Sequence, residues 1–173
     1  MANVDRPHGF TIIGSLSGGE VGRGRSYPLA AANSIIGIGC LITVTTAGVV
    51  DRSAASDTQI VGVAMEAKAA SSGGYVLVCD DPMVVLEAQT DDGTGTCTAL
   101  TDMFGNVNFV VTDATNGLSN MEIDEDSQTT TATLPLKVIG LYPDPNNAFG
   151  EFNRLVCIIN NHVYKSVGVD GLT

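Results

Sequence analysis

Two apolar runs, Leu134–Tyr142 and Leu155–Asn160, form the clearest hydrophobic pattern in the chain. Each run has the length of a β-strand and is rich in Val, Ile and Leu, which favour strands. The connection between them carries prolines, asparagines and a glycine, which favour turns. Both runs are apolar on both faces, which is typical of a strand in the middle of a sheet or at a subunit interface. We therefore predict that they form the central hairpin.

Alternation of side chains along a strand assigns these residues to faces. Leu134 and Leu136 are expected on one face of the first run, and Ile139 and Leu141 on the other. The residues that we expect in the core or at an oligomer interface are Leu134, Leu136, Ile139, Leu141, Leu155, Cys157, Ile159 and His162. His162 has no recognisable nucleophile or orienting carboxylate beside it, so we expect it to fix a strand end or an interface through hydrogen bonds.

Shorter β-branched runs, separated by Gly, Pro and Asp turns, fill most of the remaining chain. They cover residues 35–50, 59–66, 75–80, 83–90 and 106–112. Asp92-Gly93 is a hairpin signal, and short helical turns are expected at 27–33 and 98–104. No run of 12 or more residues has a helical period, so βαβ units are not expected. The pattern predicts an all-β fold, either a β-barrel or a β-sandwich, in a single domain with an extended N-terminal arm.

The first 26 residues differ from the rest in composition and charge. They are rich in glycine and serine and carry a net charge of +1, whereas the whole chain carries −11. We therefore divide the chain into an arm, residues 1–26, and a β domain, residues 27–173. The arm residues suited to contact a neighbouring subunit are Arg6, Phe10, Ile12, Ile13, Arg23 and Arg25. The alternative is that residues 10–16 are simply the first strand of the body.

The overall composition limits the classes of partner. Apolar residues make up 44% of 173 residues, which is enough for a packed core. A net charge of −11 argues against nucleic-acid binding, because phosphates would be repelled. No secretory leader or membrane-spanning run is recognisable. The four cysteines show no CxxC pairing, and we expect buried thiols.

No motif in the sequence predicts catalysis, a cofactor or a metal. Glu20 stands where the lysine of a phosphate-binding loop would be needed, and it would repel phosphate. A calcium ion could bind the acidic residues Glu122, Asp124, Glu125 and Asp126, but their spacing lacks the glycine of a calcium loop. We interpret them as a solvated loop, and Asp91-Asp92 as turn residues.

Three segments, MANVDRPHGF at 1–10, ATLPLKVIGL at 132–141 and IINNH at 158–162, resemble a family of tailed-phage virion proteins. These are the small head decoration or cement proteins, typically encoded beside the major capsid protein. The resemblance implies a non-enzymatic trimer or related cluster. It would be made in the host cytoplasm and would bind the major capsid protein on the outer surface of the phage head, bridging adjacent capsomers.

Two other classes of function stay open at this point. One is another phage structural component, in the tail or the fibre base. The other is a β-sandwich module that binds carbohydrate or a small ligand. Carbohydrate sites usually present aromatic platforms, and this chain has no tryptophan and only 5% aromatic residues, which disfavours that alternative.

Overall fold

The computed structural model describes residues 3–19, 24–92, 97, 99–165 and 168, and the structural statements below concern these residues. They form eleven β-strands in two antiparallel sheets and one short 3-10 helix, η1 (Leu100–Asp102). The all-β prediction is confirmed, and the two packed sheets are consistent with a β-sandwich domain. Within the described residues, no helix has the length and apolar character needed to cross a membrane.

The larger sheet has six strands in the order β1-β7-β11-β10-β8-β9. Their bounds are β1 Thr11–Ser15, β7 Val84–Gln89, β8 Asn106–Val110, β9 Glu122–Thr129, β10 Leu136–Leu141 and β11 Arg154–Ile159. Strands β10 and β11 pair directly, which confirms the predicted central hairpin. Thr90, just after β7, forms a β-bridge with Ile123 of β9. The sheet therefore curls, because β7 and β9 are not neighbours in its strand order.

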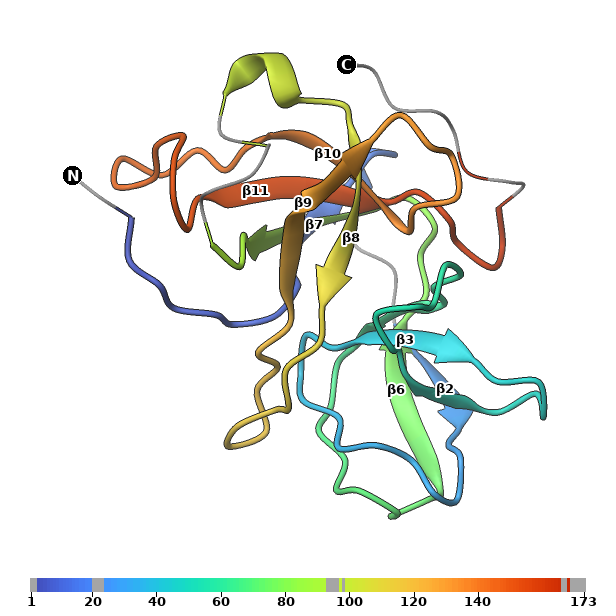
Figure 1. The fold of residues 1–173 in the computed structure, drawn as a ribbon. Coiled ribbons are helices and arrows are strands. Elements are labelled where there is room, and N and C mark those ends of the chain that lie inside the picture. Colours follow the sequence, from blue (N-terminus) through green and yellow to red (C-terminus); the bar gives the residue numbers. More distant parts are fainter. Residues whose placement is uncertain (1–2, 20–23, 93–96, 98, 166–167, 169–173) are drawn as a thin grey trace.

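The smaller sheet has five strands in the order β2-β6-β5-β3-β4. Their bounds are β2 Arg25–Pro28, β3 Leu41–Val44, β4 Val50–Arg52, β5 Gly62–Ala64 and β6 Tyr75–Cys79. Figure 1 shows this sheet below the six-stranded one. Side chains from both sheets form one hydrophobic cluster, from Leu41 and Val78 on the small sheet to Phe109 and Leu155 on the large one. Burying these apolar side chains stabilises the fold.

A β-bulge changes the face assignment that simple alternation gave for the central hairpin. Val138 pairs with Cys157 and Gly140 pairs with Val156, so Ile139 is the extra residue. A bulge inserts one residue and thereby reverses the side-chain alternation beyond it. Leu141 consequently packs against the core with Leu136 and Val138. Its expected place beside Ile139 on the opposite face is therefore wrong.

The N-terminal segment lies along the body, as Figure 1 shows. The Phe10 N–H donates to the Gly39 carbonyl (2.9 Å), and its side chain is buried. Gly9 has φ +73°, and a Cβ there would lie 2.4 Å from the Ser119 Cβ, so this close crossing requires glycine. From Thr11 the chain pairs with β7 as an edge strand. This is the arrangement expected if residues 10–16 are the first strand of the body; the division at residue 26 stays a prediction.

Three local predictions need comment. The helical turn at 27–33 is wrong, because Tyr27 pairs with Val76 and packs on the core within β2. The hairpin at Asp92-Gly93 is also wrong: β7 pairs with β1 and β11 rather than with the next strand, and Gly93 lies outside the described residues. Tertiary burial overrides local propensity in both cases. The cysteines are buried, as predicted, and are free thiols.

Candidate functional site

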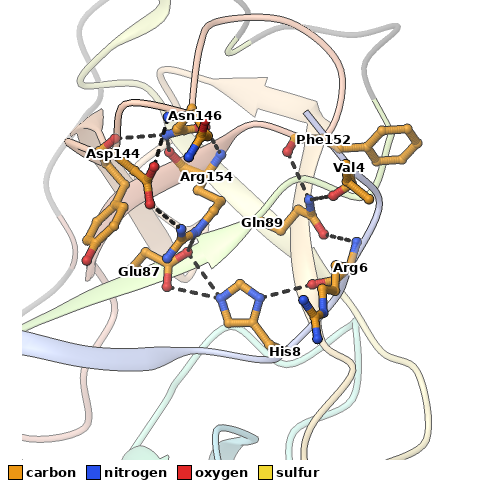
Figure 2. A network of polar contacts seen from close by, with 11 residues as sticks. Val4, Arg6, His8, Glu87, Gln89, Asp144, Asn146, Phe152 and Arg154 are labelled. Carbon is orange, nitrogen blue, oxygen red and sulfur yellow. Dashed lines mark hydrogen bonds and ion pairs between the residues drawn. The ribbon is translucent and has the colours of Figure 1, made fainter. Parts of the chain in front are cut away.

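A groove of about 800 Å³ crosses the outer face of the six-stranded sheet. One wall is the N-terminal strap, which we define as residues 3–9, and the other is the connection between β10 and β11. The floor is made by side chains of β1, β7 and β11 that point away from the core, among them Ile13, Glu87 and Arg154. Figure 2 shows how polar groups from these elements converge on Glu87.

Glu87 is the buried charge at the centre of this face. Its neighbours Leu86 and Ala88 point into the core, so alternation turns Glu87 outward, where the strap covers it to 1% exposure. Its carboxylate oxygens lie 3.1 and 3.0 Å from His8 Nε2, and Arg154 Nε donates to it at 2.7 Å. A buried charge is stable when it is both paired and hydrogen-bonded, as it is here.

Arg154 extends the network to the second wall of the groove. Its Nη1 donates to Asp144 Oδ2 at 3.2 Å, and its guanidinium lies 4.4 Å from the centre of the Tyr142 ring. Asp144 also accepts a hydrogen bond from the Asn146 N–H (2.8 Å), which fixes the turn. One arginine thus connects β11, β7 and the β10–β11 connection.

The strap is held by side chains rather than by strand pairing. Gln89 accepts from the Arg6 N–H at 2.7 Å and donates to the carbonyls of Val4 (2.7 Å) and Phe152 (2.9 Å). At the far end, Asn3 donates to the carbonyls of Ala148 and Glu151, at 2.8 Å each. These contacts join the strap to the β10–β11 connection.

The pairing shifts both partners' pKa values. The hydrogen bond to Glu87 is the main cause that raises the pKa of His8, against burial and the nearby Arg154 charge. Burial by itself would raise the pKa of Glu87, but the hydrogen bonds from His8 and Arg154 outweigh it and lower the pKa. Both ring nitrogens of His8 are engaged, since Nδ1 lies 3.1 Å from the Arg6 carbonyl. The imidazole therefore fastens the strap to the sheet.

The structure separates the arm residues that sequence analysis grouped together. Arg6 is exposed on the strap, and Ile13 lines the groove with 40% exposure. Phe10 is buried and Ile12 packs against the core. Arg25 lies on the other sheet, 3.3 Å from Asp80, and Arg23 lies outside the described residues.

The hairpin residues divide into core and outer face. Those fully buried are Leu136, Leu155, Cys157 and Ile159, while Leu134, Ile139 and Leu141 are half-buried. His162 is 3% exposed, and its Nδ1 accepts from the Tyr164 N–H at 3.1 Å. Burial, with a smaller contribution from the Lys165 charge, lowers the pKa of His162 to about 4, so it is neutral at pH 7. It forms an isolated β-bridge with Ile60, two residues before β5, in keeping with the predicted structural role.

Acidic residues gather at one end of the same sheet, and the expectation of a solvated loop there is wrong. Residues 122–129 form β9, with Glu122 at 9% and Glu125 at 1% exposure. Burial and the nearby Asp5 and Asp91 raise the pKa of Glu122 to about 7. Burial and contacts with Asp91 and Asp92 raise that of Glu125 to about 9. These oxygens are candidate ligands for a hard cation.

Sequence analysis missed His8, Glu87, Gln89 and Arg154 as a group. A signal was present, because Glu87 and Gln89 alternate with apolar residues in VVLEAQ and so mark a polar outer face. His8 and Arg154 reach this face through contacts with Glu87, which lies about 80 and 67 residues away from them in the sequence.

No family model, curated protein or solved structure matches the chain.

Replacing Arg154 by alanine tests the buried pair. Arg154→Ala leaves Glu87 buried with only His8, so we expect the free energy of unfolding to fall by about 2 kcal/mol, less than for a fully buried pair because Arg154 is one-third exposed. Urea unfolding measures this loss of unfolding free energy. The matched control is Lys68→Ala, which breaks the more exposed Lys68–Glu66 pair and should cost below about 1 kcal/mol. Equal losses in the two variants would contradict the central role of Glu87.

The His8–Glu87 pair also predicts a pH window of stability. Glu87 has a lowered folded-state pKa, so its contribution is present above about 4.5 and is lost as the pH falls through that pKa. His8 has a raised pKa, so its contribution is complete below about 6.5 and is lost as the pH rises through that pKa.

The difference in unfolding free energy between wild type and His8→Gln should therefore be largest between about pH 4.5 and 6.5 and shrink at higher pH. Urea unfolding from pH 4 to 9 measures this difference. A constant difference across that range would show that His8 acts only through packing.

Proposed function

We propose that this chain is a structural virion protein of the decoration or cement class. In this proposal it binds the major capsid protein on the outside of an icosahedral phage head, as a homotrimer, and stabilises contacts between capsomers. The resemblance of three sequence segments to that family supports the proposal, as does an all-β body built from two antiparallel sheets.

The observation that carries the proposal is the exposed guanidinium of Arg6 on the strap. Among the described residues, every other lysine and arginine makes an ion pair or a hydrogen bond through its side chain. These are Arg25, Arg52, Lys68, Lys137, Arg154 and Lys165. The Arg6 side chain has no such contact with the described part of the chain. An unpaired guanidinium on an acidic protein is suited to a carboxylate of a partner.

Apolar side chains lie in the same groove and would add to such a contact. Ile13 is 40% exposed and Leu118 is 55% exposed, and both line the groove together with Arg6. A charged donor beside exposed apolar groups resembles an interface anchor, in which apolar burial provides affinity and the ion pair provides orientation.

The outer face of the central strands supports the oligomeric part of the proposal. Val85 and Ile158 are paired neighbours on this face, and both are half-buried. Val156, two residues before Ile158 on β11, is also half-buried. Apolar residues in such a row, close to the groove, are suited to contact another copy of the chain.

Arg6→Glu tests the capsid contact. The expected result is loss of binding to undecorated heads assembled from the accompanying major capsid protein, with an unchanged melting temperature, because Arg6 makes no side-chain contact within the described fold. Cosedimentation measures binding. Lys68→Glu, the same charge change in the connection between β5 and β6, should bind normally. A point variant is preferable to deleting residues 1–14, which would remove the core residue Phe10 and most of β1. Normal decoration by Arg6→Glu would refute this anchor.

Sedimentation velocity at micromolar concentration tests the oligomer. We expect a trimer for the wild type and monomers for Ile158→Lys, whose charge would be buried in the interface, with the far-ultraviolet circular dichroism unchanged. Asn146→Lys, on the exposed β10–β11 connection, serves as a control and should stay trimeric. A monomeric wild type would contradict the trimer.

A further inference from the structure

Three carboxylates meet at the end of the six-stranded sheet where β7 approaches β9. One oxygen from each of Asp91, Asp92 and Glu125 lies within 4.8 Å of the other two. The Asp91 N–H donates to the Ile123 carbonyl at 3.1 Å, which places the segment after β7 against β9. Three carboxylates this close would repel each other strongly if all were ionised, which disfavours the charged form of the buried Glu125 unless a cation is bound.

A separate observation at the same place concerns Asn153, which precedes β11 and is fully buried. Its Nδ2 donates to the Cys97 carbonyl at 2.8 Å, while its Oδ1 has no hydrogen-bond partner within the described residues. A buried amide oxygen without a partner costs free energy. It is therefore an oxygen to which a ligand would add an interaction.

Backbone contacts place Asn153 against the carboxylates. Its carbonyl accepts from the Thr90 N–H at 3.0 Å, and the adjacent Phe152 N–H donates to the Asp92 carbonyl at 2.8 Å. Asn153 lies two residues before Leu155, which points into the core, so alternation turns the amide inward. Glu125 lies two residues after buried Ile123 and is itself buried, so both side chains point into the same end of the sheet.

We propose that Asp91, Asp92 and Glu125, with the Asn153 amide oxygen, form a calcium-binding site. All four donors are oxygens, which suits a hard cation rather than zinc or copper. Oxygens that all lie within 4.8 Å of one another can contact the same calcium ion at about 2.4 Å each. Backbone carbonyls and water would complete the typical number of about six to eight ligands.

The consequence of this site is a calcium-dependent closure of the large sheet. With the ion bound, all three carboxylates could be ionised without pushing the end of β7 away from β9. Nearby Asp5 and Asp124 add negative potential that attracts a cation without serving as ligands. The inference concerns the isolated chain and is independent of the proposed capsid function.

The test uses the full-length chain after dialysis against a chelator. Calcium chloride is titrated by isothermal calorimetry, and melting temperatures are compared in 1 mM calcium, 1 mM magnesium and potassium chloride of equal ionic strength. We expect saturable binding and a rise of several degrees with calcium, and a smaller rise with magnesium. Glu125→Gln should abolish both calcium responses, because it removes one carboxylate at nearly constant volume.

Asp126→Asn is the matched control, since it makes the same charge change on the exposed neighbouring residue and should respond like the wild type. Should Glu125→Gln fail to fold, Asp92→Asn replaces it with the same expected loss. The proposal is overturned if the wild type shows neither saturable heat nor a calcium-specific rise in melting temperature. It is equally overturned if Glu125→Gln responds as the wild type does.

Discussion

The pairing of β11 between β7 and β10 is the constraint on which the rest of the molecule depends. It joins residues that are far apart in the sequence and satisfies the backbone of the central strand on both edges. One side of β11 gives the core Leu155, Cys157 and Ile159, which are fully buried. The other side presents Arg154 to the outer face. The same strand therefore fixes both the core and the groove.

The two faces of this sheet accommodate buried acidic groups in two different ways. Glu87 is compensated inside the chain, because His8 and Arg154 bring positive charge and hydrogen bonds to it. The contacts that compensate Glu87 also hold the strap in place. Asp91, Asp92 and Glu125 instead gather three carboxylates at one place. A cation from solution would do for them what His8 and Arg154 do for Glu87.

The strap links this electrostatic arrangement to binding. Its backbone and its histidine face the sheet, and the Arg6 side chain is left exposed. Gln89 and Asn3 hold it through side-chain hydrogen bonds rather than through strand pairing. Such an arrangement is suited to a segment that binds a neighbouring subunit in the proposed capsid role.

The sequence by itself determined the all-β class, the central hairpin and most strand positions, because β-branched runs and turn residues are local signals. It also predicted a structural role for His162, in keeping with its burial, whereas the expected contact role of Arg6 stays a prediction. The tertiary structure decided what the local signals could not. The bulge at Ile139 turned Leu141 inward, and long-range pairing brought β1 and β11 to opposite edges of β7. The groove network and the carboxylate cluster arise only in the tertiary structure, because contacting members lie up to 148 residues apart in the sequence. They become neighbours through the order of strands in the sheet, which alternation within one strand does not encode.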